Sequence, residues 1–221
     1  MPAGMPPPSM GFVMRETPEP TRQYAGEFRD RIYQFYRANR RDLPWRETRE
    51  PYRILVSEFM LQQTQVARVL EKYDGFITRF PDFAALHAAS VEDLLREWQG
   101  LGYNRRALAL KRTASLIMTG WSGVLPDDGE ALLSFPGIGK ATAAAIRAFA
   151  FGKPSVLLET NIRRVFIHCF FHDLPVVTDE EILPLVEETL DRENPRDWYY
   201  ALMDYGAYLG RTKENPNRRS R

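Results

Sequence analysis

Two acidic residues lie in settings that suit carboxylate chemistry, and the first is Glu58. It stands in the segment ILVSEFMLQQTQV, whose spacing predicts a helix with Leu55 and Phe59 turned inward. On that helix Glu58, Gln62 and Gln65 would share the opposite face, which places one carboxylate among amides. Taken alone, such an acid is more often a solvated surface residue, so the segment needs independent support.

The second acid, Glu159, follows the apolar residues Val156–Leu158 and precedes Thr-Asn and two arginines. This order predicts a helix beginning directly after the acid. Negative charge is favoured at a helix N-terminus, so a purely structural role for Glu159 explains the pattern as well as catalysis does.

A third segment is typical of phosphate binding. The sequence LSFPGIGKATAAAI (133–146) predicts a helix end, a Pro-Gly-x-Gly turn and a second helix of small residues. Glycines allow backbone N–H groups at the start of that helix to approach a phosphate oxygen. We interpret residues 133–147 as a helix-hairpin-helix DNA element rather than an ordinary tight connection, since a lone GxG would not carry the flanking Leu, Pro and Lys-x-Thr-Ala.

These segments must be positioned by helices. From Arg22 onward apolar residues recur at spacings of three and four, as in Phe28, Ile32 and Phe35, and again in Leu55, Phe59, Val66 and Leu70. Further helices are expected to begin at Ser90, Arg105 and Thr178. We predict an all-α fold of about nine or ten helices, with one short strand-like run near Val156–Leu158 and a disordered, proline-rich leader at 1–21.

Composition excludes several classes of protein. The 221 residues contain 30 Lys and Arg against 29 Asp and Glu, so an anionic partner must meet a local basic face. The single cysteine, Cys169, excludes disulfide scaffolds and four-cysteine metal sites within this chain. No apolar run approaches the roughly 20 residues that a membrane span requires. We expect a cytoplasmic protein, nucleoid-associated if prokaryotic, with no membrane partner.

Five ordered motifs resemble the helix-hairpin-helix base-excision DNA glycosylases, and MutY-type adenine glycosylases above all. They are RDLPWR (41–46), SEFMLQQTQV (57–66), GLGY (100–103), PGIGKATA (136–143) and ETNIRRV (159–165). The resemblance implies two lobes with the active site in the cleft between them. It predicts a six-helix barrel at 47–153, a terminal lobe made of 22–46 and 154–210, and a basic tail at 211–221.

The resemblance also implies a set of site residues. Glu58 matches the family's acid, Glu159 occupies the position where the family usually has Asp, and Asn161 joins them as a catalytic residue. Gln63 and Tyr103 are the candidates for a wedge that enters the space left by a flipped nucleotide. The other predicted DNA-binding residues are Arg41, Arg46, Gln62, Arg105, Gly137, Gly139, Lys140, Thr142 and Arg164. The predicted base pocket consists of Leu43, Trp45, Leu61, Val66, Tyr200 and Met203.

Departures from the family pattern refine the expected activity. Ala141 stands where lyase-competent relatives carry a lysine nucleophile, and the neighbouring Lys140 is turned by roughly 100° from it on a helix. This favours a monofunctional glycosylase. We expect the family's four-cysteine cluster and the C-terminal domain that recognises 8-oxoguanine to be missing, because residues 211–221 follow where the cluster would begin. We therefore expect no iron–sulfur cluster and no other metal or cofactor, although the hairpin remains a candidate site for a monovalent cation.

The substrate remains open at this stage. The expected partner is double-stranded DNA with a mispaired or damaged base, bound by a monomer, and the motifs favour adenine opposite 8-oxoguanine or guanine. Tyr200 replaces the Glu that adenine glycosylases offer to the base, which keeps thymine or uracil opposite guanine as an alternative. A catalytically inactive, damage-sensing relative is the other alternative, since Glu159 and Ala141 both depart from the pattern.

Overall fold

The computed structural model describes residues 22–171, 174–212 and 216–220, and over these ranges the protein is helical, as the apolar spacing predicts. The expected leader at 1–21 lies outside the described residues. The run Val156–Leu158 forms no strand, and within the described ranges one isolated β-bridge joins Val177 to Ser220. None of the described helices is long and apolar enough to cross a membrane.

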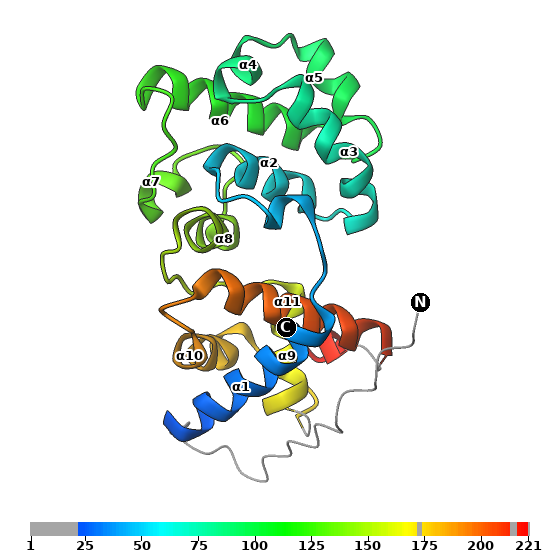
Figure 1. The fold of residues 1–221 in the computed structure, drawn as a ribbon, viewed down its shortest axis with the longest axis vertical. Helices are drawn as coiled ribbons and strands as arrows, with labels where there is room; N and C mark the ends of the chain where they lie inside the picture. The colour runs from blue at the N-terminus through cyan, green and yellow to red at the C-terminus, as the bar shows by residue number, and fades with distance from the viewer. Residues whose placement is uncertain (1–21, 172–173, 213–215, 221) are drawn as a thin grey trace. The chain divides into compact units, whose positions relative to one another are not determined.

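The chain divides into two compact units (Figure 1). The central unit spans 42–153, and the terminal unit combines the segments on either side of it. The first boundary falls between Arg41 and Asp42, before the expected position after Arg46. The central unit contains the 3₁₀ helix η1 (Pro44–Arg46) and seven α-helices, which are α2 (Pro51–Leu61), α3 (Val66–Arg79), α4 (Phe83–Ala88), α5 (Val91–Trp98), α6 (Arg105–Gly120), α7 (Gly129–Leu133) and α8 (Lys140–Phe151).

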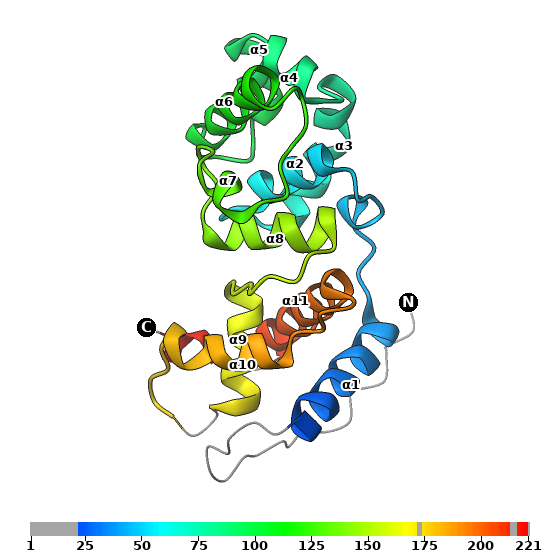
Figure 2. The ribbon, with the colours of Figure 1, turned by 90° about the vertical axis from the view of Figure 1, so that its left-hand side faces the viewer.

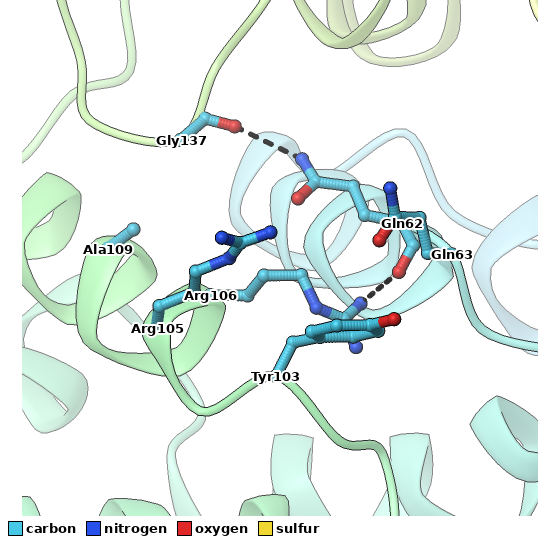
Figure 3. A pocket seen from close by; sticks show the side chains of 7 residues that line it. All are labelled: Gln62, Gln63, Tyr103, Arg105, Arg106, Ala109 and Gly137. Carbon is cyan, nitrogen blue, oxygen red and sulfur yellow. Dashed lines mark hydrogen bonds between the residues drawn. The ribbon is translucent and has the colours of Figure 1, made fainter.

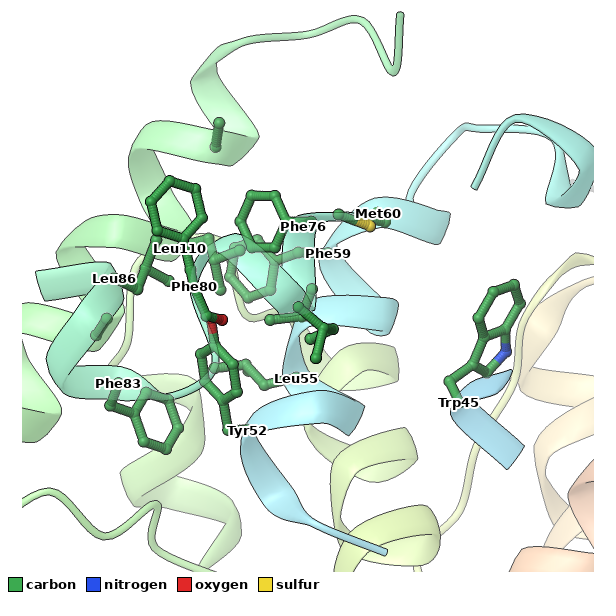
Figure 4. Packing of buried hydrophobic residues seen from close by; sticks show 14 of the residues in the cluster. Trp45, Tyr52, Leu55, Phe59, Met60, Phe76, Phe80, Phe83, Leu86 and Leu110 are labelled. Atoms are coloured by element: carbon green, nitrogen blue, oxygen red, sulfur yellow. The ribbon is translucent and has the colours of Figure 1, made fainter. Parts of the chain in front are cut away.

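Helix α2 lies in the middle of the central unit and contacts α3, α6 and α8. Its residues from Ile54 to Val56 and from Phe59 to Met60 are wholly buried, because the helix is surrounded rather than amphipathic. Aliphatic and aromatic side chains together form the core around it, and Figure 4 shows part of this cluster. Phe76 makes edge-to-face contacts with Phe80 and Trp98. Such packing holds the ends of α2 and α6 in fixed positions.

The apolar residues Leu55, Phe59, Val66 and Leu70 belong to two helices with a turn between them. α2 ends at Leu61, and α3 starts at Val66 after a turn. Leu70 is exposed on α3 rather than part of the core. The apolar residues on the two sides of the turn mimic one continuous helical period, which is why spacing alone did not reveal the break.

The terminal unit gathers both ends of the chain (Figure 2). It consists of α1 (Arg22–Asn39), α9 (Thr160–Phe170), α10 (Asp179–Thr189), α11 (Pro195–Thr212) and the 3₁₀ helix η2 (Pro216–Arg219). Phe28 on α1 makes edge-to-face contacts with Phe166, Phe170 and Trp198, so rings from α1, α9 and α11 form one core.

Helices α9 and α11 approach each other closely because α11 carries glycine where they meet. A Cβ atom at Gly206 would lie 2.2 Å from the backbone oxygen of Asn161, and one at Gly210 would lie 2.7 Å from the Arg164 guanidinium. Any side chain at Gly206 would therefore force the two helices apart. This contact fixes the first turn of α9, where Glu159 and Asn161 lie.

The end of the described chain packs on α9. Asn217 Nδ2 donates a hydrogen bond to the carbonyl of Thr160 at 2.8 Å, and Arg219 Nη1 donates one to the carbonyl of Phe171 at 2.7 Å. The Val177 amide donates to the Arg219 carbonyl at 2.7 Å. The segment expected as a basic tail thus begins inside α11. Its described end, residues 216–220, packs against α9 and is called the strap below.

Candidate nucleic-acid interface and carboxylate sites

The predicted hairpin is formed by α7, a tight turn and α8, and its turn needs glycine at one position. Gly137 has a φ of +84°, and a Cβ atom there would lie 2.7 Å from the Phe59 ring and 3.0 Å from Ala109. Gly139 is the N-cap of α8 and makes no side-chain cap. The first amides of α8 therefore meet no capping side chain, and a helix start of this kind favours an anion such as phosphate. Lys140 and Ala141 are exposed on that first turn.

Gln62 connects this hairpin to the end of α2. Its side-chain amide donates hydrogen bonds to the Gly137 carbonyl at 3.1 Å and to the Thr142 hydroxyl at 3.3 Å. Three predicted DNA-binding residues thus contact one another. The sequence indicated that Gln62 and Gln65 share the helical face of Glu58. This prediction is wrong, because α2 ends at Leu61 and both glutamines lie beyond it.

Gln63 and Tyr103, the two wedge candidates, share an uncommon backbone conformation. Among the described residues only they and Ser122 have positive φ without being glycine, at 54° for Gln63 and 47° for Tyr103. Left-handed backbone at a bulky residue persists only where the surrounding structure holds it. Both residues are exposed, and Tyr103 keeps 55% of its surface.

The two wedge candidates line one open hollow of about 450 Å³ (Figure 3). Its other lining residues come from the turn after α2, from α6 and from the hairpin, and they are Gln62, Arg105, Arg106, Ala109 and Gly137. Arg105 is exposed, and its guanidinium lies 5.6 Å from the centre of the Tyr103 ring. Polar, aromatic and basic groups therefore gather beside the hairpin turn.

Three of the predicted DNA-binding arginines have other surroundings. Arg41 Nε lies 2.5 Å from a carboxylate oxygen of buried Asp204, and the Arg41 amide donates to the other oxygen at 3.0 Å. Arg46 is buried. Arg164 Nη1 donates to Asn161 Oδ1 and to the Gly206 carbonyl, both at 2.8 Å. Arg41 and Arg164 therefore bond to groups within the terminal unit, and the sequence did not reveal Asp204 as the partner of Arg41.

Glu58 lies on α2, partly buried, between the buried residues Ser57 and Phe59. The helix is the most enclosed in the central unit, so the backbone that carries this carboxylate is rigidly placed. Ser57 donates its hydroxyl to the Ile54 carbonyl at 2.8 Å, which satisfies the buried hydroxyl within the helix.

Glu159 is the N-cap of α9. One carboxylate oxygen accepts hydrogen bonds from the amides of Asn161 and Ile162, both at 2.8 Å, and the other accepts one from Asn161 Nδ2 at 3.2 Å. Burial raises the pKa of Glu159, and the three donated hydrogen bonds and the charge of Arg164 oppose that shift. The carboxylate is thus held at a defined orientation in an environment that disfavours its charge.

The side-chain amide of Asn161 lies between Arg164 and Glu159, and its orientation is fixed by Arg164. Because a guanidinium can only donate, Arg164 requires Asn161 to present its carbonyl oxygen, which leaves the Asn161 amide group to face Glu159. The chain from Gly206 through Arg164 and Asn161 therefore orients Glu159. The sequence placed Asn161 and Arg164 near the acid but gave no signal for Gly206.

The predicted base-pocket residues fall in both units. In the central unit Leu43 and Trp45 belong to the buried core, with Leu61 and Val66 packed partly against it, and these four do not line the hollow beside the hairpin. In the terminal unit Tyr200 is buried beneath the Arg196 guanidinium, 5.3 Å from its ring centre, and Met203 is partly buried. Among the residues that the structure describes, no group of three His, Cys, Asp or Glu side chains is placed to hold a metal ion.

Comparisons with known proteins relate this chain to base excision DNA repair proteins. The family description "HhH-GPD superfamily base excision DNA repair protein" matches residues 56–188. An adenine DNA glycosylase of Mycobacterium tuberculosis is 40% identical over 180 residues, which cover 78% of this chain and 58% of that protein. A thymine/uracil-DNA glycosylase of Methanothermobacter thermautotrophicus is 31% identical over 182 residues, covering 80% of this chain and 82% of that protein.

Solved structures add to the fold assignment. A thermostable thymine-DNA glycosylase superimposes with a TM-score of 0.77 at 28% identity, covering 88% of this chain and 91% of that one. By contrast, the chain spans little more than half the length of the adenine DNA glycosylases of Mycobacterium tuberculosis and Buchnera aphidicola to which it is similar.

Proposed function

The chain belongs to the HhH-GPD superfamily of base excision DNA repair proteins, and we propose that it is a monofunctional DNA glycosylase that excises a mispaired or damaged base. One observation carries this proposal. Gln63 and Tyr103, both exposed and both in left-handed backbone, lie around the same hollow as the hairpin glycine Gly137. Side chains that enter duplex DNA must stand next to the element that grips the phosphate backbone, and this surface combines the two.

In the proposed complex, DNA contacts residues of the central unit. The first amides of α8 receive a phosphate oxygen, while Lys140 and Arg105 supply positive charge nearby. Gln63 and Tyr103 fill the space left in the base stack when the target nucleotide rotates out of the duplex. Phosphate contacts give affinity without reading the sequence, so the choice of base depends on the pocket.

The reaction is hydrolysis of the N-glycosidic bond. The departing base takes the bonding electrons and the sugar gains oxocarbenium character, after which water adds at the anomeric carbon and loses a proton. We assign Glu58 as the acid that protonates the departing base. We assign Glu159, oriented by Asn161, as the carboxylate that stabilises the positive charge on the sugar.

The absence of a lysine at position 141 supports a glycosylase without lyase activity. Ala141 occupies the exposed first turn of α8 and offers no amine for a Schiff base. Lys140 precedes it, and successive residues on a helix point about 100° apart. The product is then an intact strand with an abasic site, which breaks only on treatment with alkali.

For the substrate we favour adenine opposite 8-oxoguanine or guanine. The support is the 40% identity to an adenine DNA glycosylase. Thymine or uracil opposite guanine is the second candidate, because the chain matches most of the length of a thymine/uracil-DNA glycosylase and a solved thymine-DNA glycosylase. Tyr200 offers a phenol where adenine recognition would use a carboxylate, and a polar site discriminates only when its groups match the base.

The test incubates the protein with duplexes that contain adenine, thymine, uracil or hypoxanthine opposite guanine or 8-oxoguanine. Each reaction is divided, and one half is treated with hot alkali before the strands are separated. Cleavage that appears only after alkali identifies both the base and the monofunctional reaction. Glu58→Gln should lower this cleavage roughly 10²–10⁴-fold, whereas Glu71→Gln, which removes an exposed acid from α3, should leave it unchanged. Binding without cleavage of any duplex would favour a damage-sensing protein and overturn the proposal.

A further inference from the structure

Arg106 is a buried arginine that no step of the proposed reaction uses. It is the second residue of α6 and only 7% exposed. Its neighbour Arg105 is exposed, so two adjacent arginines face opposite surroundings. Burial lowers the pKa of Arg106, because removing a guanidinium from water disfavours its charge. The fold must compensate that cost with hydrogen bonds.

The compensation comes from two turns that are far apart in the chain. Six oxygen atoms accept hydrogen bonds from the two terminal nitrogens of Arg106. Nη1 donates to the carbonyls of Phe59 (2.9 Å), Met60 (3.1 Å) and Gln62. Nη2 donates to the Thr64 hydroxyl (2.9 Å) and to the carbonyls of Leu101 (2.9 Å) and Gly102 (3.1 Å).

These acceptors flank the two wedge candidates. Gln62 and Thr64 stand on either side of Gln63, and Leu101 and Gly102 directly precede Tyr103. The guanidinium also lies against the Tyr103 ring, 5.5 Å from its centre, and Figure 3 shows it pointing toward the Gln62 carbonyl. One rigid group therefore contacts both turns at the positions where the backbone is left-handed.

The backbone conformation explains why such a contact matters. Each residue in a sparsely populated region costs on the order of 1–3 kcal/mol and stays there only when its surroundings require it. Phe59 and Met60 belong to the last turn of α2, where helical carbonyls lack intrahelical partners. Arg106 donates hydrogen bonds to these carbonyls and to acceptors in both turns. Its guanidinium therefore links the turns of Gln63 and Tyr103 to α2 and to each other.

We propose that Arg106 is a positioning residue that couples the turns of Gln63 and Tyr103, so that both side chains enter DNA as one preformed wedge. The inference rests on the proposed glycosylase function. Lysine cannot replace arginine here, because its ammonium donates from a single point and cannot span acceptors in two turns. Arg106→Lys keeps the charge and most of the volume but uncouples the turns.

The first arm of the test compares two substrates in single-turnover excision. One is the duplex that the wild-type protein cleaves best, and the other carries the same base opposite a stable abasic analogue, where no base pair has to be broken before the base rotates out. Arg106→Lys should slow excision from the paired duplex at least 10-fold and from the unpaired base by less than 3-fold. The matched control is Arg112→Lys, an exposed arginine on the same helix, and it should change neither rate. Equal losses on both substrates, or no loss on either, would overturn the proposal.

The second arm is a double-mutant comparison, which separates positioning from general instability. Arg106→Lys added to a variant that already carries Gln63→Ala and Tyr103→Ala should cause no further loss on the paired duplex. A full additional 10-fold loss would show that Arg106 acts elsewhere, and would contradict the coupling.

The third arm does not depend on catalysis. Hydrogen–deuterium exchange of the DNA-free protein should become faster at 62–64 and at 101–103 together in Arg106→Lys, with the rest of the core unchanged. Faster exchange in only one turn would contradict the coupling. If the wild-type protein excised no base, the proposed function would fail, and the fluorescence of 2-aminopurine at the target position would replace excision as the measure of base opening. Equal opening by wild type and Arg106→Lys would then overturn the inference.

Discussion

Replacing Glu159 by glutamine tests the carboxylate site most directly, because the structure separates its effect on the fold from its effect on the chemistry. Glutamine keeps one oxygen that can accept from the amides of Asn161 and Ile162, so the cap of α9 survives. The second oxygen becomes an NH₂ group that faces Asn161 Nδ2 at 3.2 Å, and two donors then oppose each other. Asn161 cannot turn round, because its oxygen is held by Arg164.

The lost hydrogen bond and its opposed donors should cost about 1–2 kcal/mol of unfolding free energy. Removal of a disfavoured charge offsets part of this, so the variant should stay folded. Loss of a charge-stabilising group from a transition state is larger, and we expect single-turnover excision to fall roughly 10²–10⁴-fold, or about 3–5 kcal/mol. Glu159→Asp should lose part of the activity, since a carboxylate one methylene shorter is displaced by roughly 1 Å and such displacements cost on the order of 10²-fold.

The pH dependence of stability provides an independent readout. Because the pKa of Glu159 is raised in the folded protein, its carboxyl holds a proton more tightly when folded than when unfolded. Its contribution to stability is therefore complete below about pH 4.5 and is lost as pH rises through the folded pKa. Relative to wild type, Glu159→Gln should become more stable as pH rises above about 4.5, as measured by denaturant unfolding at several pH values.

A matched control uses the same kind of cap elsewhere. Glu50 is exposed and caps α2 through the amides of Tyr52 and Arg53, both at 2.9 Å. Glu50→Gln should leave excision unchanged. Wild-type activity in Glu159→Gln would remove this residue from the mechanism, and a relative stability that falls with rising pH would refute the account of its burial.

Four further predictions follow from the same contacts. Glu58→Gln should lower excision by 10²–10⁴-fold while DNA affinity, measured by titration, changes by only a few-fold, and a near-normal rate would contradict its role as the acid. Gly137→Ala should weaken DNA binding and lower the unfolding free energy by roughly 1–3 kcal/mol, because its Cβ would lie 2.7 Å from the Phe59 ring at a φ of +84°. Gly139→Ala, whose Cβ meets no atom within 4 Å, should remain folded. Deleting residues 216–221 should lower unfolding free energy by roughly 1–3 kcal/mol, because the bonds of Asn217 and Arg219 to α9 and to the segment after it are lost, and an unchanged denaturation midpoint would show that the strap is not structural. Purified protein should contain no stoichiometric iron by absorbance and metal analysis, and its detection would require ligands beyond the single Cys169.

The sequence by itself determined the features that depend on neighbours along the chain. Apolar spacing predicted the helical class, and Pro-Gly-Ile-Gly followed by small residues predicted the hairpin, because turns and helix starts depend on local backbone preferences. The order of acid, Thr and Asn placed Glu159 before a helix. The positive φ values of Gln63 and Tyr103 carried no such signal, since neither residue type prefers left-handed backbone.

Only the tertiary structure decided which charges face inward. Helical spacing shows that Arg105 and Arg106 point about 100° apart, but two identical residues give no hint of which one is buried. The choice is made by carbonyls of Phe59, Met60 and Gln62, more than 40 residues away, which converge where α2 ends. Arg41 is likewise held by Asp204 across 163 positions of sequence. Electrostatic partners of this kind depend on how helices pack, and packing brings together residues whose separation along the chain carries no information about their contact.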